Sequence, residues 1–310
     1  MEYENPPIEE GINYSSEHPL KEFLQLLLGV SMLVIVSIVV INLLIGILAK
    51  QIPFEFEQKM AESVNLIELL GEEGLDGNLY NSSAKSLEPA LLSDELRLKV
   101  ARKQYLQLIA DKISPAMNLP EGMQLTLHYS DSDQVNAFAT LGGHIVFFEG
   151  LLAKLGSEDE LAAVMAHELA HVKLRHPIVA IGKGLTMATL AASISGASGS
   201  SAGNWLISRS ANLSLLKFSR DQEAAADAES AAALVSIYGH IGGAYALFQH
   251  FAEIEGASED QFDVAEIFRS HPYSEVRWLA LKKLALQQGW LTQGPTLPLQ
   301  LPQRVLSESE

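Results

Sequence analysis

The most continuous hydrophobic stretch of the chain lies near its N-terminus, at residues 23–49, where Gln25 and Asn42 are the most polar members. About 20 apolar residues are enough to cross the hydrocarbon core of a bilayer. A cleaved signal peptide is disfavoured because the run is long and the region before it is acidic rather than basic. A buried helix of a soluble domain rarely stays apolar on every face. The pattern therefore predicts one transmembrane helix over 23–49.

The flanks of this stretch say little about its orientation. Residues 1–22 are polar and acidic and predict an exposed flexible tail. Lys21 lies on one side of the apolar run, whereas Lys50 and Lys59 lie on the other. Because this charge difference is small, the positive-inside rule leaves open which side of the membrane the rest of the chain faces.

Downstream of the apolar run, the pattern predicts one mostly helical domain over 50–290. Residues 52–70 suggest a strand-like or interfacial piece followed by a helix, and 53–56 could lie at the lipid headgroups or in a strand. Apolar positions three and four apart predict a helix that starts at Ser93 or Asp94 and ends before Pro115.

The middle of the chain changes to an alternating pattern that is typical of strands. Residues 124–129, 135–140 and 144–148 each alternate, and Gly142-Gly143 between the last two is a hairpin turn signal. We expect a small antiparallel sheet that packs on the helices following it.

Helical periodicity returns after the sheet. Ser157 and Glu160 are spaced as a capping box for a helix that runs on to Leu174 and stops before Pro177. Residues 178–197 are apolar and rich in small side chains, which favours a packed helix or hairpin over a second membrane span. Further helices are expected up to Gly239 and over 241–254 and 274–288, followed by a disordered tail at 291–310.

Composition narrows the class of partner. The formal net charge is −17 and the chain has no cysteine. An acidic chain is a poor match for nucleic acid, so no nucleic-acid partner is expected. The absence of cysteine excludes disulfides and thiolate metal sites.

The helix that begins after Ser157 carries the clearest chemical motif. His167 and His171 stand four apart, with Glu168 directly after the first, in the HExxH pattern of zinc hydrolases. On a helix, both imidazoles face one ion and the glutamate lies near enough to act on a water. The alternative is a solvated helix with incidental histidines, so residues elsewhere must decide.

A third ligand is expected from the alanine-rich helix downstream. Glu223 is the best candidate, and Asp227 lies one turn further on the same face. A second carboxylate in this position can accept the free N–H of a ligand histidine and so fix the ring. Without the HExxH motif, an exposed acidic helix face would be the better interpretation.

Together, these motifs resemble the gluzincin zinc metallopeptidases, and among them the HtpX / CAAX-prenyl-protease family. The resemblance covers about 90–288 and implies an α+β, mostly helical, zincin-like domain. The chain looks like the members with a soluble peptidase domain, here tethered by one helix. The matching segments follow the family's order: Asn136-Ala137-Phe138-Ala139, Gly142-Gly143-His144-Ile145-Val146, His167-Glu168-Leu169-Ala170-His171, Ser219-Arg220-Asp221-Gln222-Glu223, Ala226-Asp227, Ser270-His271-Pro272 and Arg277.

The resemblance also implies roles for single residues. One Zn²⁺ per subunit would be held by His167, His171 and Glu223, with Glu168 as general base. Asp227 would orient a ligand histidine, and Asn136 with Ala137 would hydrogen-bond an extended peptide by strand addition. Two further residues are implied near the metal: His271, which would stabilise the oxyanion or regulate access, and Arg277, which would position it.

The function that follows is a membrane-anchored zinc endopeptidase acting on protein or peptide substrates, with a role in membrane or envelope protein quality control. A binding or chaperone module that uses zinc structurally is the second hypothesis, and the intact Glu168 favours the first. Prenyl-protein processing needs a chamber of several spans, and the single clear apolar run counts against it. Substrate, cleavage preference and oligomeric state are left open.

Overall fold

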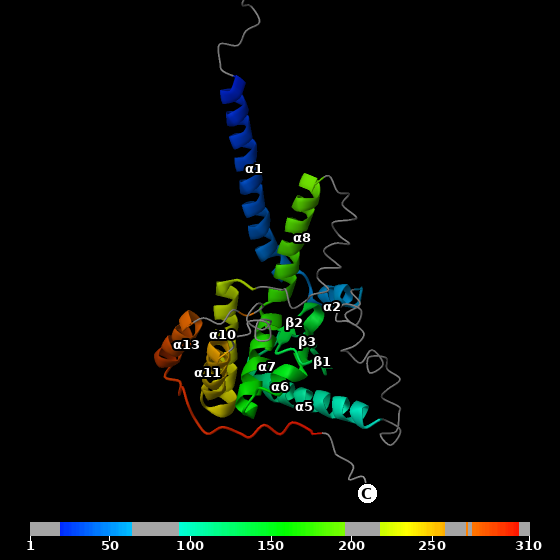
Figure 1. Ribbon diagram of the computed structural model, residues 1–310, viewed down its shortest axis with the longest axis vertical. Helices are drawn as coiled ribbons and strands as arrows, with labels where there is room; N and C mark the ends of the chain where they lie inside the picture. The colour runs from blue at the N-terminus through cyan, green and yellow to red at the C-terminus, as the bar shows by residue number, and fades with distance from the viewer. Residues whose placement is uncertain (1–18, 64–92, 196–217, 258–270, 272–274, 304–310) are drawn as a thin grey trace, which may run out of the picture. The chain divides into compact units, whose positions relative to one another are not determined.

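The computed structural model of the chain describes residues 19–63, 93–195, 218–257, 271 and 275–303 (Figure 1). It separates into two compact units, Met1–Leu44 and Ile45–Glu310. The first holds most of helix α1 (Pro19–Leu48), and the second holds every other described element. The proposed domain limits of 50 and 290 stay predictions.

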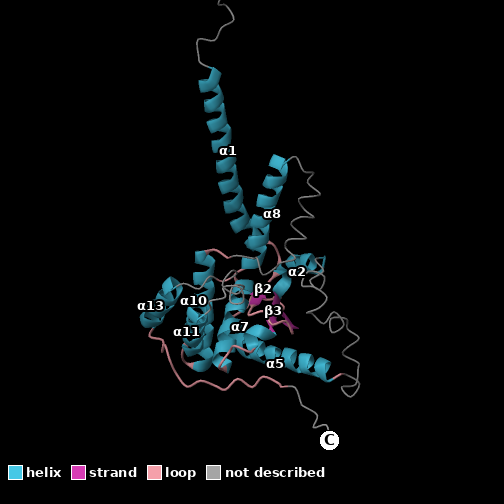
Figure 2. Cartoon of the chain, in the orientation of Figure 1, coloured by secondary structure: helices cyan, strands magenta, loops and turns pink. Residues whose placement is uncertain are grey.

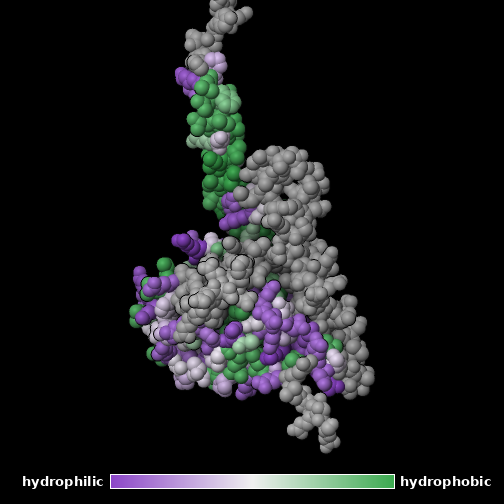
Figure 3. Space-filling model, in the orientation of Figure 1, coloured by the Kyte–Doolittle hydropathy of each residue, from purple (hydrophilic) through white to green (hydrophobic). Residues whose placement is uncertain are grey.

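Helix α1 confirms the predicted long apolar helix. Leu26, Leu33 and Leu43 are 69%, 68% and 63% exposed, and Figure 3 shows a nearly continuous hydrophobic surface along α1. Of the helices that the structure describes, the one running Pro19–Gln51 has the length and apolarity needed to cross a bilayer. Such a surface is costly in water, which is consistent with insertion into lipid.

The second unit opens with a short turn of 3₁₀-helix, η1 (Ala49–Gln51), and helix α2 (Phe54–Ser63). The expected strand at 53–56 is therefore wrong, because the chain is helical from Phe54. The alternative position at the lipid headgroups stays a prediction. Pro53 accepts the first backbone bonds of this helix through its carbonyl and lacks the N–H that would be left unpaired at a helix start. Glu55 and Glu57 in the first turn suit the helix dipole.

Helix α5 (Asp94–Met117) starts as predicted, with the Ser93 hydroxyl accepting the Leu96 N–H at 3.2 Å. It does not end before Pro115, which lies inside its last turn. One backbone bond is lost there, but Ile113 and Met117 are buried on the core side and keep the turn packed. Asn118, in the left-handed region with φ 49°, ends the helix.

The sheet has three strands, β1 (Thr126–Ser130), β2 (Ala137–Ala139) and β3 (His144–Phe148), in the order β1-β3-β2. Strands β2 and β3 form the predicted antiparallel hairpin, and Gly142 and Gly143 in its turn have φ 71° and 80°. The expectation of a purely antiparallel sheet is wrong, because β1 pairs with β3 in parallel. After β1 the chain skips the position beside it in the sheet and forms β2 at the far edge. Strand β3 then returns and fills the position between β1 and β2.

The remaining helices are α6 (Glu149–Leu152), α7 (Glu158–Lys173), α8 (His176–Ser195), α10 (Arg220–Tyr238), α11 (Gly242–Ala257) and α13 (Glu275–Gln288). Helix α7 is the centre of this unit: α5, α10, α11 and strand β2 all pack against it, and α5 and α10 also contact each other (Figures 1 and 2). Its buried side chains, among them Leu161, Met165 and Leu169, occupy the middle of the core. The residues of the HExxH motif are thus carried by the most enclosed helix.

Both ends of α7 follow from the sequence. The Ser157 hydroxyl accepts the Glu160 N–H at 3.2 Å, and the Glu160 carboxylate reaches back one residue further than expected, to the Gly156 N–H. The helix ends at Lys173, before Pro177, which lies in the first turn of α8. Residues 178–195 are thus helical, and the first half of α8 packs through Ile178 and Val179.

The expected disordered tail at 291–310 is wrong over residues 291–303, which form an extended segment against the domain. The Leu297 N–H donates to Asp159 at 2.7 Å and the Leu297 carbonyl accepts the Glu158 N–H at 3.0 Å, at the start of α7. Leu299 and Leu301 pack on the main core. A polar, proline-rich sequence misled the prediction because its few leucines and backbone groups have partners in the fold. Residues 304–310 lie outside the described part. The predicted flexible tail at 1–22 is wrong over residues 19–22, which form the first turn of α1, and its residues 1–18 also lie outside the described part.

This segment generates a stability prediction. Truncation after Trp290 should lower the free energy of unfolding by at least about 2–4 kcal/mol. It removes two half-buried leucines and the hydrogen bonds that Leu291, Pro295, Leu297 and Gln300 make with the rest of the domain. Denaturant unfolding of the detergent-solubilised chain measures it, with truncation after Gln303 as the control. An unchanged midpoint for the shorter chain would show that 291–303 contributes nothing.

Candidate metal centre

Helix α7 places the two histidines of the motif side by side. His167 and His171 are one turn apart, and their Nε2 atoms lie 3.0 Å from each other. His171 is fully buried and His167 nearly so, with side-chain exposures of 0% and 13%. The spacing of the motif therefore produces the shared face that it predicts.

Helix α10 brings a carboxylate to the same point. Its start is fixed by a capping box in which the Ser219 hydroxyl accepts the Gln222 N–H and the Gln222 side chain accepts the Ser219 N–H. Glu223 follows in the first turn, and its oxygens lie 3.4 Å from His167 Nε2 and 3.6 Å from His171 Nε2. The small side chains of α10 let it pack closely on α7, where the Ser230 hydroxyl donates to the Ala163 carbonyl.

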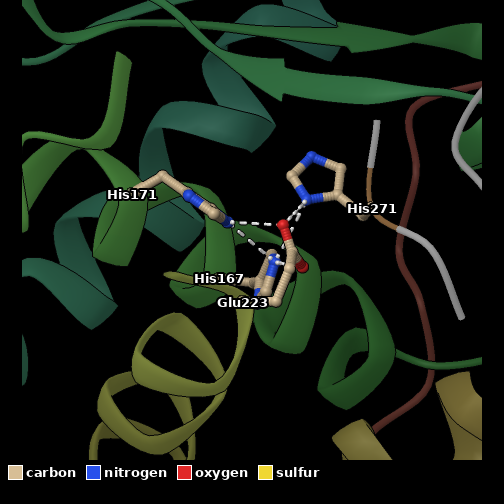
Figure 4. Close-up of side chains that lie close together, drawn as sticks. All are labelled: His167, His171, Glu223 and His271. Carbon is tan, nitrogen blue, oxygen red and sulfur yellow. Dashed lines mark hydrogen bonds and ion pairs between the residues drawn. The ribbon is translucent and has the colours of Figure 1, made fainter. Parts of the chain in front are cut away.

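His271 completes the cluster from the segment before α13 (Figure 4). Its Nδ1 lies 3.3 Å from His167 Nε2 and 3.2 Å from Glu223 Oε1. One donor atom from each of His167, His171, Glu223 and His271 lies within 4.8 Å of all the others. Among the residues that the structure describes, this is the group of histidine and acidic side chains able to hold a metal ion.

The donor set fits zinc. Tetrahedral bonds of about 2.0–2.1 Å to nitrogen and oxygen place neighbouring donors about 3.3 Å apart. The closest contacts within the cluster, at 3.0–3.6 Å, match that separation. Two or three imidazoles and one carboxylate are ligands that zinc accepts, although other divalent transition metals accept them as well.

A second ring of side chains orients these donors. Asp227 Oδ1 lies 3.2 Å from His167 Nδ1, which leaves Nε2 of that ring free to bind a metal. Arg277 donates to both oxygens of Asp227, at 2.9 and 2.8 Å, and forms an ion pair with Glu223 at 2.8 Å. The resemblance implied that Arg277 would position His271. In the structure Arg277 contacts the two carboxylates, and one of them, Glu223, lies 3.2 Å from His271 Nδ1.

Two neighbours of His171 were missed by sequence reasoning. His176 Nδ1 lies 2.9 Å from His171 Nδ1, and the Phe218 ring stacks on His171 with the centroids 4.0 Å apart. The sequence indicated only weakly that they lie near the site: His176 starts the helix after the HExxH helix, and Phe218 directly precedes the N-cap of α10. Neither has a spacing that predicts a contact without the fold.

The electrostatics of the cluster favour a bound cation. Burial opposes the charged form of His167, but hydrogen bonds to Asp227 and Glu223 outweigh it and raise its pKa to about 10. Burial likewise opposes ionisation of Glu223, yet the contacts with His167 and His271 hold its pKa far below the usual value. Burial and the neighbouring imidazoles lower the pKa of His171. The buried carboxylates of Glu223 and Asp227 are thus stabilised by positive charge nearby, which a divalent ion would supply.

Glu168 is the acidic residue beside the cluster. Its Oε2 accepts the Ala139 N–H at 2.7 Å, and its Oε1 lies 3.4 Å from His271 Nε2. The side chain is 3% exposed, and burial raises its pKa despite the opposing charges of His271 and His167. A buried carboxylate with a raised pKa is suited to take up and return a proton.

The residues predicted to bind substrate lie on the neighbouring strand. Asn136 directly precedes β2 and Ala137 begins it, and both are fully buried. Within the described part of the chain, neither side-chain polar atom of Asn136 has a hydrogen-bond partner. The edge of β2 therefore lies next to Glu168 but is not open in this conformation.

The fold and the cluster are those of a metal-dependent peptidase: residues 100–285, more than half of the chain, match Peptidase family M48, and the protein belongs to this family. The chain is 30% identical to the Beta-barrel assembly-enhancing protease of Yersinia pestis over 40% of its own length and 27% of that protein's. It is 26% identical to Metalloprotease LoiP of Escherichia coli over 67% of its length and 88% of the relative's. It is 36% identical to Mitochondrial metalloendopeptidase OMA1 of Schizosaccharomyces pombe over 23% of its own length and 21% of the relative's length.

The chain thus spans only about a quarter of the Yersinia pestis relative. Membership of the family supports a protease that needs a metal, usually zinc, and that acts on protein substrates. These comparisons agree with the expected gluzincin resemblance. The roles of the individual residues are proposals, taken up below.

The contact between Asp227 and His167 generates a prediction. Asp227→Asn should weaken zinc affinity by about 10–100-fold, because an amide in place of the carboxylate no longer fixes the imidazole as strongly. Competition with a chromogenic chelator measures the affinity, and Asp221→Asn, at an exposed position of the same helix, is the control. Equal affinities for the Asp227 variant and the wild type would contradict this role.

Proposed function

We propose that this protein is a membrane-anchored zinc endopeptidase that hydrolyses peptide bonds of extended protein substrates. The observation that carries the proposal is the convergence of His167, His171 and Glu223 from two helices, with Glu168 beside them. Membership of Peptidase family M48 supports peptide-bond hydrolysis as the reaction of this site. One zinc ion per subunit would be held by the two imidazoles and the carboxylate.

The side chains divide the work as follows. A zinc ion in this set would supply a Lewis acid and lower the pKa of a water. Glu168 would take the proton of that water and pass it to the leaving amine. The Ala139 N–H holds the Glu168 carboxylate in place, and Asp227 holds His167 in the tautomer that binds a metal.

The hydrogen-bond register of the hairpin supports strand addition at β2. The Asn136 carbonyl accepts the Phe148 N–H, and the Thr140 N–H donates to the His144 carbonyl, so these backbone groups face β3. Successive residues of a strand alternate, which turns the backbone of Ala137 to the free edge. An extended substrate would pair with Ala137 there, once the edge is uncovered, with its next peptide bond toward Glu168.

The contacts of His271 favour regulation of access over oxyanion stabilisation. A catalytic zinc site keeps one coordination position for water, whereas a site with four protein donors is closed. His271 Nδ1 lies where a fourth ligand belongs, within hydrogen-bonding distance of His167 Nε2 and Glu223 Oε1. We infer that this ring must leave the cluster before a substrate is hydrolysed.

The apolar helix and the relatives support the remaining part of the proposal. Helix α1 would anchor the chain in a lipid bilayer through residues 23–49. The names of two relatives refer to β-barrel assembly and to mitochondria. Quality control of membrane or envelope proteins is a role consistent with both observations.

The four-donor cluster also supports a second candidate, a binding or chaperone module with structural zinc. A closed set of protein ligands is typical of structural sites. The buried Glu168 distinguishes the two functions, because a structural site has no use for a base next to the metal. Casein cleavage with and without a chelator separates them.

The proposed base gives the first test. Glu168→Gln should retain zinc and lose nearly all hydrolysis, by about 10²–10⁴-fold, because the amide takes up no proton. Zinc content by elemental analysis and cleavage of a fluorogenic peptide are measured on the same sample. Undiminished cleavage by the zinc-loaded variant would refute the mechanism; His167→Ala is the companion variant that should lose the metal.

His271 gives the second test. His271→Ala should keep zinc through the three remaining ligands and raise the rate of peptide hydrolysis, since the fourth position becomes open. Rates are compared at equal zinc loading, and His250→Ala, at a partly exposed histidine outside the cluster, is the control. A fall in rate at unchanged zinc content would favour the oxyanion role instead.

A further inference from the structure

Helix α2 places a buried carboxylate between two turns of the peptidase domain. Glu57 is 1% exposed, although the glutamates before and after it on the same short helix, Glu55 and Glu62, are exposed. Its Oε1 accepts the Gly142 N–H at 3.1 Å, and its Oε2 forms an ion pair with Arg175 Nη2 at 2.7 Å. A carboxylate is rarely buried without such partners, so the position has a specific role to explain.

Both turns that Glu57 joins adjoin the proposed site. Gly142 lies in the turn that follows β2, three residues after Ala139, whose N–H holds Glu168. Arg175 lies in the turn between α7 and α8, four residues after His171 and next to His176. Glu57 touches none of the candidate metal ligands, but it ties together the segments that carry the substrate edge and the end of the HExxH helix.

The backbone of both turns depends on this packing. Arg175 has φ 61°, a conformation that residues with a side chain rarely adopt, and its guanidinium is paired with Glu57. Gly142 has φ 71°, and a Cβ there would lie 2.8 Å from Ala61 Cβ of α2. Phe54 lies close to both turns: its ring centroid is 5.4 Å from the Arg175 guanidinium carbon, and a Cβ on Gly143 would lie 3.1 Å from its tip.

A small second core is formed by residues that neighbour the ion pair in sequence. It is separate from the main core and joins the segment after α1, helix α2, the β2–β3 turn and the start of α8 through Ala49, Ala61, Leu141, Ile178 and Val179. The match to Peptidase family M48 begins at residue 100, so the helix that supplies Glu57 lies outside it. Only five residues separate the end of α1 from the start of α2.

We infer that Glu57 is a positioning residue of the peptidase: it holds the β2–β3 turn against the α7–α8 turn and so fixes the edge strand to which an extended substrate binds. Helix α2, which follows the apolar helix and precedes the family domain, then helps to hold the substrate-binding edge in place. The kinetic part of the test rests on the proposed function, whereas the structural part does not.

The experiment uses the full chain in detergent and four variants. Glu57→Ala removes both contacts, and Glu57→Gln keeps an oxygen for the Gly142 N–H but loses the ion pair. Gly142→Ala disturbs the same contact from the other side, through its clash with Ala61 and its positive φ. Glu55→Gln, at an exposed position of α2, is the matched control.

Amide hydrogen exchange tests whether Glu57 holds the β2–β3 turn against the α7–α8 turn, and it needs no activity assay. Glu57→Ala and Gly142→Ala should speed exchange about tenfold over 139–146 and 173–179 and leave 220–238 unchanged, because the opening is local. Glu57→Gln should have an intermediate effect and Glu55→Gln none. Exchange unchanged in both turns, or faster equally in α10, would overturn the inference, the second result pointing to general stability.

Peptide kinetics on the same samples test the consequence. With zinc content unchanged, Glu57→Ala should raise KM for an extended fluorogenic peptide about tenfold and leave kcat within about twofold, since the edge strand and not the metal is displaced. A fall in kcat with KM unchanged would overturn the positioning role. If the wild type cleaves no peptide, the proposed function fails, and hydrogen exchange still decides whether Glu57 holds the two turns.

Discussion

Two carboxylates and three imidazoles buried within a few ångströms of one another form the interaction on which the rest of the structure depends. Charges in a protein interior are costly unless they are paired. Glu223 and Asp227 are both nearly inaccessible. The groups that face them are the Arg277 guanidinium and the imidazoles of His167 and His271, which would hold a cation between the two helices. A metal ion in the cluster would therefore stabilise the fold as well as provide chemistry.

The architecture can be understood as the means of enclosing this cluster. Helix α7 lies in the middle of the core and presents His167 and His171, and α10 packs against it through small side chains such as Ala226. A larger residue along that contact would move Glu223 away from the imidazoles. The sheet lies on the other flank and delivers the Ala139 N–H to Glu168, so that the base is fixed by the edge expected to receive the substrate.

Much of the site was predictable because it is encoded locally. The spacing of His167 and His171, and of Glu223 and Asp227, acts within single helices, and the caps at Ser157 and Ser219 fix where those helices start. The parallel pairing of β1 with β3 and the ordered segment at 291–303 were not predictable in this way. Both depend on which surfaces meet in three dimensions. Phe218 and Glu57 were missed for the same reason, because their partners are distant in the sequence. His176 lies only five residues after His171, and its contact depends on the turn between α7 and α8.

The central claim is that side chains from α7 and α10 share one ion. X-ray absorption at the zinc edge of the purified full-length chain tests it most directly. One zinc per chain, surrounded only by nitrogen and oxygen at about 2.0–2.1 Å with the outer scattering of at least two imidazoles, is the predicted result. A chain that binds no zinc stoichiometrically, or whose zinc environment is unchanged when Glu223 is replaced by alanine, would contradict the account.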